Sequence, residues 1–144
     1  MNGSKLLERA IAIAVEAHRG QKDKYGAPYI LHPLRVMSRL QDTRAKTVAI
    51  LHDVVEDSDW TFKDLKKEGF PKPILDALDC VTRRDDESYE QFVKRSASNL
   101  LARRVKLADL EDNMDLRRIP VLTEKDLQRL KKYHRAWNAL NSDE

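Results

Sequence analysis

The segment from His52 to Asp57, which reads His-Asp-Val-Val-Glu-Asp, brings one imidazole and three carboxylates into six residues. In a helix His52 would lie over Glu56, because residues four apart share a face. The same spacing would pair Asp53 with Asp57. Burying four ionisable groups is costly unless an opposing charge compensates them. A divalent metal fits this need, since histidine nitrogen and carboxylate oxygen are common metal ligands in proteins.

Two other positions supply further ligands. His32 directly precedes Pro33, and the residue before a proline is disfavoured in helical geometry, so we expect His32 at the entrance of a helix that Pro33 opens. Asp109 lies in an apolar stretch of another expected helix, where a buried acid needs a partner. We predict that His32, His52, Asp53 and Asp109 form one metal site. Such a set leaves positions open for water and substrate and suits manganese, iron or zinc.

The elements that must position these residues are helices. Apolar residues recur with a helical period along the chain, and no segment shows the pattern of a strand. We therefore predict an all-α fold, a single compact HD-type helical domain of about eight helices over residues 1–144. Thr61, Ser88 and Thr123 are expected to cap three of them. The expected helices cover residues 5–17, 33–40, 44–55, 61–69, 73–82, 88 onward, 100–114 and 123–140.

The composition is typical of a soluble helical protein. Charged residues make up 35%, aromatic residues 6%, and the mean hydropathy is −0.66. Apolar runs such as Ala10–Val15 are far too short to cross a membrane, and the N-terminus lacks the apolar stretch of a secretory signal. Cys80 is the single cysteine, which excludes an internal disulfide and favours a reducing compartment. We expect a cytoplasmic protein that has no membrane partner.

Charge is unevenly distributed along the chain. The net charge is +3, but the stretch from Arg19 to Lys46 holds seven basic and two acidic residues, whereas His52–Asp59 holds four acids and no base. This pattern favours a cation site beside a pocket for an anion. Nucleic-acid binding is not indicated, because no aromatic single-strand binding motif accompanies the basic composition.

Three motifs resemble those of the RelA/SpoT-type hydrolase domain. Gly26–Pro33 is similar to its Gly-x-Pro-Tyr-Ile-x-His-Pro element, His52–Thr61 to its central signature, and Lys106–Asp109 followed by Asn113-Met114 to its third element. They occur in the family's order over roughly residues 5 to 118. The chain has no room for the synthetase domain of the long bifunctional enzymes. It therefore resembles a stand-alone small alarmone hydrolase, close in plan to the metazoan SpoT-like enzymes.

The resemblance implies an HD-type metal-dependent phosphohydrolase with one Mn²⁺ per chain. It implies the same four metal ligands that we predict from the residues themselves. It also implies catalytic roles for Glu56 and Asp57, and a nucleotide contact for Asn113. The implied reaction removes the 3′-diphosphate of (p)ppGpp and releases pyrophosphate, with Glu56 or Asp57 activating the attacking water.

Other side chains are expected to contact this small-molecule nucleotide. Lys24 and Arg83 are our candidates for stabilising its phosphate charge. Tyr29 is a candidate for packing on the sugar or base, with a core role as the alternative.

Two departures from the family pattern bear on which base is recognised. The family usually carries Arg-Lys in the loop after the first helix, where the arginine helps to hold the base, but this chain has Asp23-Lys24. Leu110, Glu111 and Asp112 also replace the common Arg-Leu-His. Without the stacking guanidinium, an adenine alarmone such as (p)ppApp becomes an alternative substrate.

Two rival functions stay open from the sequence. One is another HD-type nucleotide phosphohydrolase, and the other is a non-catalytic helical binding module that keeps the metal as a structural brace. The first would release phosphate rather than pyrophosphate. The second would have no use for Glu56 and Asp57. The sequence does not give the oligomeric state.

Overall fold

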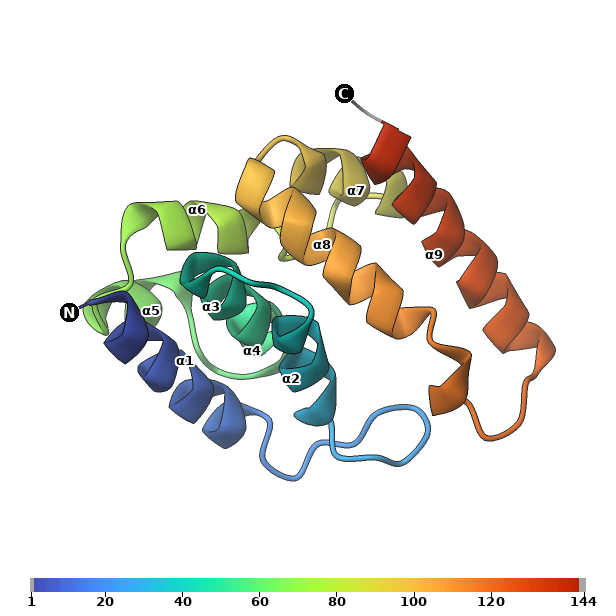
Figure 1. Cartoon of the computed structure of the whole chain (residues 1–144), viewed down its shortest axis with the longest axis horizontal. Coiled ribbons are helices and arrows are strands. Elements are labelled where there is room, and N and C mark those ends of the chain that lie inside the picture. The colour runs from blue at the N-terminus through green and yellow to red at the C-terminus, as the bar shows by residue number, and fades with distance from the viewer. Residues whose placement is uncertain (1, 143–144) are drawn as a thin grey trace.

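The computed structural model describes residues 2–142 and is all-helical over that range (Figure 1). Its elements are α1 (Gly3–Ala17), α2 (Leu31–Ser38), α3 (Thr43–Leu51), α4 (Val54–Asp57), α5 (Phe62–Lys67), α6 (Lys72–Cys80), α7 (Tyr89–Ala97), α8 (Leu100–Asn113), the 3₁₀ helix η1 (Leu116–Arg118) and α9 (Glu124–Ser142). Residues 2–142 contain no β-strand, only an isolated bridge between Lys22 and Pro28. The predicted all-α class is confirmed. None of the described helices is both long and apolar enough to span a membrane.

Helix α3 is the centre of the main hydrophobic core. It packs against α1, α2, α6 and α8, which surround it in Figure 1. Five of its nine residues, from Thr47 to Leu51, are buried in succession, so α3 presents no solvated face there. The small side chains of Ala45 and Ala49 let neighbouring helices approach closely. The Asp42 carboxylate begins the helix by accepting a hydrogen bond from the Ala45 amide at 2.8 Å.

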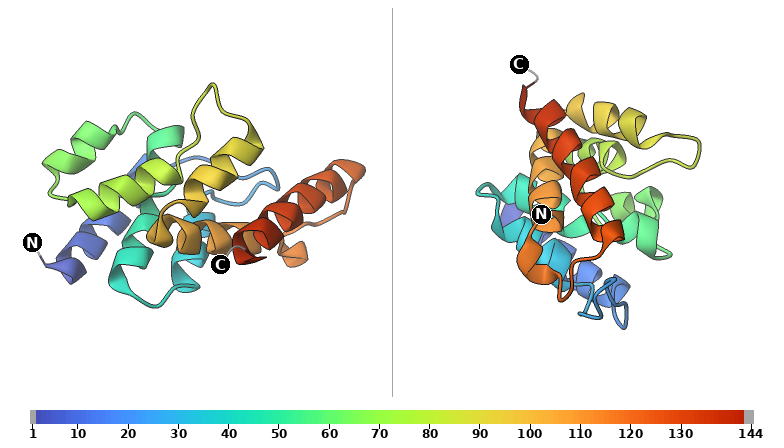
Figure 2. Two further views of the ribbon diagram at one scale, coloured as in Figure 1. Left: turned by 90° about the horizontal axis from the view of Figure 1, so that it is seen from above. Right: turned by 90° about the vertical axis from the view of Figure 1, so that its right-hand side faces the viewer.

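Helix α9 covers a different side of the molecule. It lies along α8 and also contacts α7, as Figure 2 shows. A second hydrophobic cluster lies where α9 meets α7 and α8. It is formed by Val93, Leu110, Ala136 and Leu140. Thr123 and Asp126 cap its first turn reciprocally, as predicted, through bonds of 2.9 and 3.2 Å. The capping boxes predicted at Thr61 and Ser88 are also present.

The prediction of one unbroken helix over 44–55 was wrong. Helix α3 ends at Leu51, a turn follows at His52 and Asp53, and α4 begins at Val54. Asp53 has φ −107° and ψ 0°, in the bridge region between the helical and extended conformations. The ring Nδ1 of His52 approaches the Ala49 carbonyl at 2.6 Å, which holds the ring at the end of α3. The turn lets His52 and Asp53, which are adjacent in the sequence, direct both side chains toward the same point.

The predicted start of the second helix was also late. Helix α2 begins at Leu31, so His32 lies inside its first turn and Pro33 follows it there. In the first turn a backbone N–H has no helical acceptor, so the N–H that Pro33 lacks costs no hydrogen bond. The 3₁₀ helix η1, between α8 and α9, was not predicted.

Candidate metal centre and nucleotide pocket

Four side chains from three separate parts of the chain converge on one buried point. The Nε2 atoms of His32 and His52 lie 2.8 and 3.3 Å from Oδ1 of Asp109. The Asp53 Oδ2 atom lies 3.0 Å from Nε2 of His52 and 3.9 Å from Nε2 of His32. His32 and His52 are each 4% exposed and Asp109 is 6% exposed. The structure thus brings three of the four predicted ligands, His32, His52 and Asp109, within the reach of one ion. The fourth, Asp53, lies beside both imidazoles.

The hydrogen bonding of both imidazoles fits a metal. The Nδ1 atom of each ring has an acceptor, the Ala49 carbonyl for His52 and an Asp112 carboxylate oxygen at 2.7 Å for His32. Each Nε2 faces a carboxylate oxygen. The Nε2 atom of His32 is within hydrogen-bond distance of Oδ1 of Asp109 at 2.8 Å, whereas the buried Nε2 of His52 has no hydrogen-bond partner among the described residues. Imidazole nitrogens and carboxylate oxygens that face one another share either a proton or a cation.

The pKa values of the side chains at this centre also indicate a site for positive charge. Burial alone would lower the pKa of His52, but Asp53 and Asp109 outweigh it and raise that pKa well above its usual value. Burial would raise the pKa of Asp109, yet Lys106 and the two imidazoles hold it well below its ordinary range. The carboxylates thus stay ionised and the site attracts positive charge, either as protons on the rings or as a metal ion.

Lys106 and Asn113 fix the orientation of Asp109. The Lys106 ammonium lies 3.1 Å from Oδ2 of Asp109, and the Asn113 amide donates to Oδ1 at 3.3 Å. Lys106 is itself buried, with its charge 4.7 Å from the centre of the Phe92 ring. The Oδ1 atom of Asp109 is thereby directed at the two histidines.

Glu56 and Asp57 differ in their surroundings. Glu56 lines the cavity above the metal centre, and its Oε1 accepts a hydrogen bond from the Arg83 backbone amide at 2.7 Å. Asp57 does not line that cavity, although its backbone carbonyl is held by the Gln21 side chain at 2.8 Å. Partial burial raises the pKa of both carboxyl groups, and Asp53 adds to the effect. A carboxylate with a raised pKa is a better proton acceptor near neutral pH.

A cavity of about 380 Å³ opens from the metal centre. All four predicted substrate contacts, Lys24, Tyr29, Arg83 and Asn113, line it. The Tyr29 hydroxyl donates a hydrogen bond to Oδ2 of Asp53, so its ring lies against the metal centre itself. The volume suits a small ligand such as a nucleotide.

The cavity also has a basic end, which we define as Lys24, Arg118, Arg129 and Lys132. Among the described residues, Lys24 and Lys132 form no ion pair, whereas Arg129 pairs with Asp126 at 3.1 Å. Burial lowers the pKa of Lys24, and repulsion from Arg129, Arg118 and Lys132 lowers it further. Cations that repel one another across a cavity attract an anionic ligand.

Curated relatives with alarmone-related names match most of this chain. It is 32% identical over 120 residues to the guanosine-3′,5′-bis(diphosphate) 3′-pyrophosphohydrolase of Aquifex aeolicus (strain VF5), covering 75% of this chain and 17% of that protein. It is 30% identical over 125 residues to the bifunctional (p)ppGpp synthase/hydrolase SpoT of Escherichia coli (strain K12), covering 76% of this chain and 18% of that protein. The chain thus spans less than a fifth of the length of either relative. No family model matches it.

A solved structure matches nearly the whole fold. It is described as a metazoan ortholog of SpoT that hydrolyses ppGpp, and it superposes with a TM-score of 0.73 at 25% identity, over 94% of this chain and 84% of that one. This chain has a RelA/SpoT-type HD hydrolase domain. The three sequence motifs that suggested this family supply, in the RelA/SpoT-type domain described here, the turn before α2, the α3–α4 turn and the buried face of α8.

The two departures from the family pattern have structural roles in this RelA/SpoT-type domain. Asp23 accepts hydrogen bonds from the backbone amides of Tyr25 and Ala27 at 2.9 and 3.0 Å, so it shapes the loop before α2. Its other oxygen lies 3.5 Å from the Arg118 guanidinium. Asp112 is fully buried, does not line the cavity and bonds to His32 and Arg35 instead, so its link to base recognition stays a prediction.

The basic residues of η1 and α9 were missed in the sequence. Charged residues occur on every side of the predicted final helix, so it reads as a solvated surface helix. Arg129, Lys132 and Tyr133 are three and four positions apart and therefore share one face, which was the available signal. Only the packing of α9 along α8 directs that face into the cavity.

Proposed function

We propose that this protein catalyses manganese-dependent hydrolysis of the 3′-diphosphate of (p)ppGpp-type alarmones and releases pyrophosphate. The observation that carries this proposal is a single cavity that joins the buried His32, His52 and Asp109 group, with Asp53 beside it, to a cluster of cations. The names of the relatives and the fold match support the same reaction class. The proposal takes residues 1–144 as one hydrolase domain.

His32, His52, Asp53 and Asp109 would hold the metal. Bound there, a divalent ion would supply Lewis-acid chemistry and would lower the pKa of water towards about 7. Glu56 is placed to accept the proton of the attacking water, because it lines the cavity and its carboxylate is held by the Arg83 amide. Asp57 is the second candidate, and its pKa is raised in the same way.

The bond that breaks joins the nucleotide 3′ oxygen to the nearer phosphorus. Water adds its oxygen to that phosphorus, the pyrophosphate carries this oxygen away, and the 3′ oxygen leaves as a hydroxyl after taking a proton. Arg83 lines the cavity as a cation without an ion pair among the described residues, so it is available to stabilise the charge of the 3′ phosphates. Lys24 also lines the cavity without an ion pair there, and it lies at the basic end. Lys106 is committed to Asp109 and acts on the ligand set instead.

The basic end suits phosphates at the other end of the substrate. A nucleotide with diphosphates at both its 3′ and 5′ positions would place one at the metal centre and offer the other to Lys24 and Lys132. The base is proposed to be guanine or adenine. The adenine alternative rests on Asp23, whose carboxylate stands in the loop where the family usually carries an arginine.

A nucleotide panel tests the proposal. Purified protein is incubated with Mn²⁺ and, separately, with ppGpp, ppApp, GMP and AMP, and the released anions are separated by ion-exchange chromatography. The expected result is pyrophosphate from at least one alarmone and no phosphate from the monophosphates. Phosphate from GMP or AMP alone would favour the rival HD-type phosphohydrolase. No turnover of any nucleotide would favour the binding module.

A further inference from the structure

Asp112 is a buried carboxylate that the proposed chemistry does not use. It lies on α8, three residues after the metal ligand Asp109, and is 0% exposed. Its Oδ2 atom accepts a hydrogen bond from Nδ1 of His32 at 2.7 Å. Its Oδ1 atom accepts one from Nε of Arg35 at 2.8 Å. A carboxylate without exposure is stable only if such partners compensate its charge.

Arginines on two sides hold the Asp112 carboxylate in place. Arg35 reaches both oxygens from α2, and Arg118 of η1 lies 3.1 Å from Oδ2. The carboxylate cannot rotate away from His32 without losing these charge-assisted hydrogen bonds.

The two histidines of the metal centre are supported differently. His52 directs its Nδ1 at a neutral backbone carbonyl, that of Ala49, whereas His32 directs its Nδ1 at the charged Asp112. A carboxylate partner fixes the tautomer with the proton on Nδ1 and leaves the Nε2 lone pair for the metal. It also makes the ring a stronger electron donor than a carbonyl partner does.

We propose that Asp112 is a positioning residue that orients His32 for metal binding and raises the affinity of the centre for a divalent ion. It acts through His32, since it does not line the cavity or reach the substrate. The inference rests on the metal centre of the proposed function. It adds a chain of hydrogen bonds, from the partly exposed Arg35 through the buried Asp112 to His32, that couples α2 and α8 to the ion.

The test is a calorimetric titration of metal-free protein with Mn²⁺, without any nucleotide. Asp112→Asn keeps the shape of the side chain and removes its charge, and we expect its Kd for Mn²⁺ to rise about 10- to 100-fold. Asp115→Asn is the matched control, because Asp115 follows α8 directly and also pairs with an arginine, Arg117, but does not touch His32. Its Kd for Mn²⁺ should equal that of the wild type.

A second variant guards against loss of folding. Asp112→Asn with Arg35→Met removes both charges together, so that Arg35 is not left without its partner. The same rise in Kd is expected from this double variant, with the metal-free protein still folded by circular dichroism. A residue that only joined α2 to α8 would lower the melting temperature and leave the Kd of the folded protein unchanged.

The outcomes separate this inference from the proposed function. Wild-type affinity for Mn²⁺ in both the single and the double variant would overturn the inference alone, because the metal centre would still be intact. Failure of the wild type itself to bind Mn²⁺ would overturn the inference and the proposed function together. A raised Kd in the folded variants, with Asp115→Asn unchanged, would support it.

Discussion

The metal centre and the basic end of the same cavity are built on opposite principles. At the metal centre His32, His52 and Asp109 are almost fully buried, and apart from Nε2 of His52 their side-chain polar atoms have partners. At the basic end Lys24 and Lys132 are exposed, and among the described residues they have no carboxylate partner. The first region is held in place before any ligand arrives, whereas the second depends on the ligand to neutralise it.

This difference indicates what each region contributes. A preorganised centre needs little rearrangement when the ligand binds, because the folded chain already holds its groups in place. Such a centre suits the chemical step. Lysines with solvent-accessible charges are screened by salt, so they contribute to attraction and binding more than to catalysis. Substitutions in the two regions should therefore affect kcat and KM differently.

The largest expected effect comes from removing a metal ligand. His52→Gln deletes the imidazole whose Nε2 lies 3.0 Å from Asp53 and 3.3 Å from Asp109. We expect loss of stoichiometric Mn²⁺ by elemental analysis and a fall in kcat of about a thousandfold or more. Circular dichroism of the metal-free variant separates lost metal binding from lost folding, because His52 is buried and its ring also bonds to the Ala49 carbonyl. Full Mn²⁺ occupancy in this variant would refute the ligand assignment.

Glu56→Gln should lower kcat by about 10²- to 10⁴-fold and leave Mn²⁺ affinity unchanged, because it removes a proton acceptor and no ligand. Asp57→Asn should have the smaller effect, since Asp57 does not line the cavity. Asp59→Asn, an exposed acid of the same segment, is the control and should behave as wild type. Initial rates at saturating substrate give these values. A larger loss of kcat in Asp57→Asn would reverse the assignment of the base.

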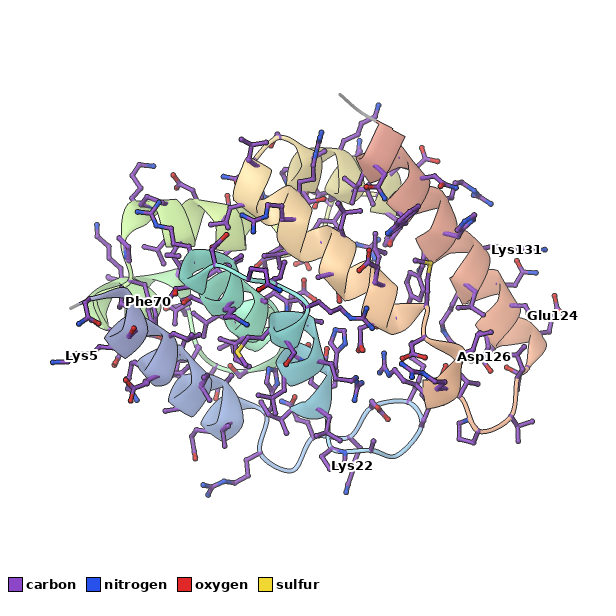
Figure 3. The ribbon with its side chains drawn as sticks, in the orientation of Figure 1. Lys5, Lys22, Phe70, Glu124, Asp126 and Lys131 are labelled. Carbon is purple, nitrogen blue, oxygen red and sulfur yellow. The ribbon has the colours of Figure 1, made fainter. Side chains whose placement is uncertain are left out.

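Substitutions at the basic end should act on binding. Lys24→Ala and Lys132→Ala should each raise KM by about tenfold, the loss of one contact to a charged phosphate, with kcat nearly unchanged. The effect should shrink as salt is added. Lys131→Ala is the matched control, since Lys131 lies on the exposed outer side of α9 in Figure 3. A fall in kcat without a rise in KM would show that the two regions are not divided as described.

The smallest effect is a shift in titration. Burial, together with repulsion from Arg129 and Arg118, lowers the pKa of Lys24, so Lys24 should lose its proton at a lower pH than an isolated lysine does. A bound diphosphate favours the charged form and should raise this pKa again. NMR titration of ¹³C-methylated lysines, with and without pyrophosphate, measures both values. An unchanged pKa for Lys24 on binding would remove it from the phosphate site.

Local patterns predicted most of the fold, because helix periods and caps are properties of short segments. The capping boxes at Thr61, Ser88 and Thr123 illustrate this, since each needs only residues three apart. The break between α3 and α4 was not predictable in that way. It depends on the backbone of Asp53 and on the contact between the His52 ring and the Ala49 carbonyl.

The convergence of His32, His52 and Asp109 was predictable because histidine and aspartate are rare in apolar surroundings. The residues that support them were not, since their roles arise from contacts between distant helices. In the sequence, Asp112 is only a departure from a family motif. Its role becomes visible in the structure, where α2 places His32 and Arg35 within hydrogen-bond distance of its carboxylate. The α9 cations likewise gain their role only from the packing of that helix.

Hydrolysis in ¹⁸O-labelled water tests the central claim most directly. The preferred alarmone is turned over with Mn²⁺, and the products are analysed by mass spectrometry, with a chelator in a parallel reaction. The account predicts one ¹⁸O atom in each pyrophosphate, none in the nucleotide, and no turnover after chelation. Label in the nucleotide, release of orthophosphate in place of pyrophosphate, or turnover that persists with the metal removed would contradict it.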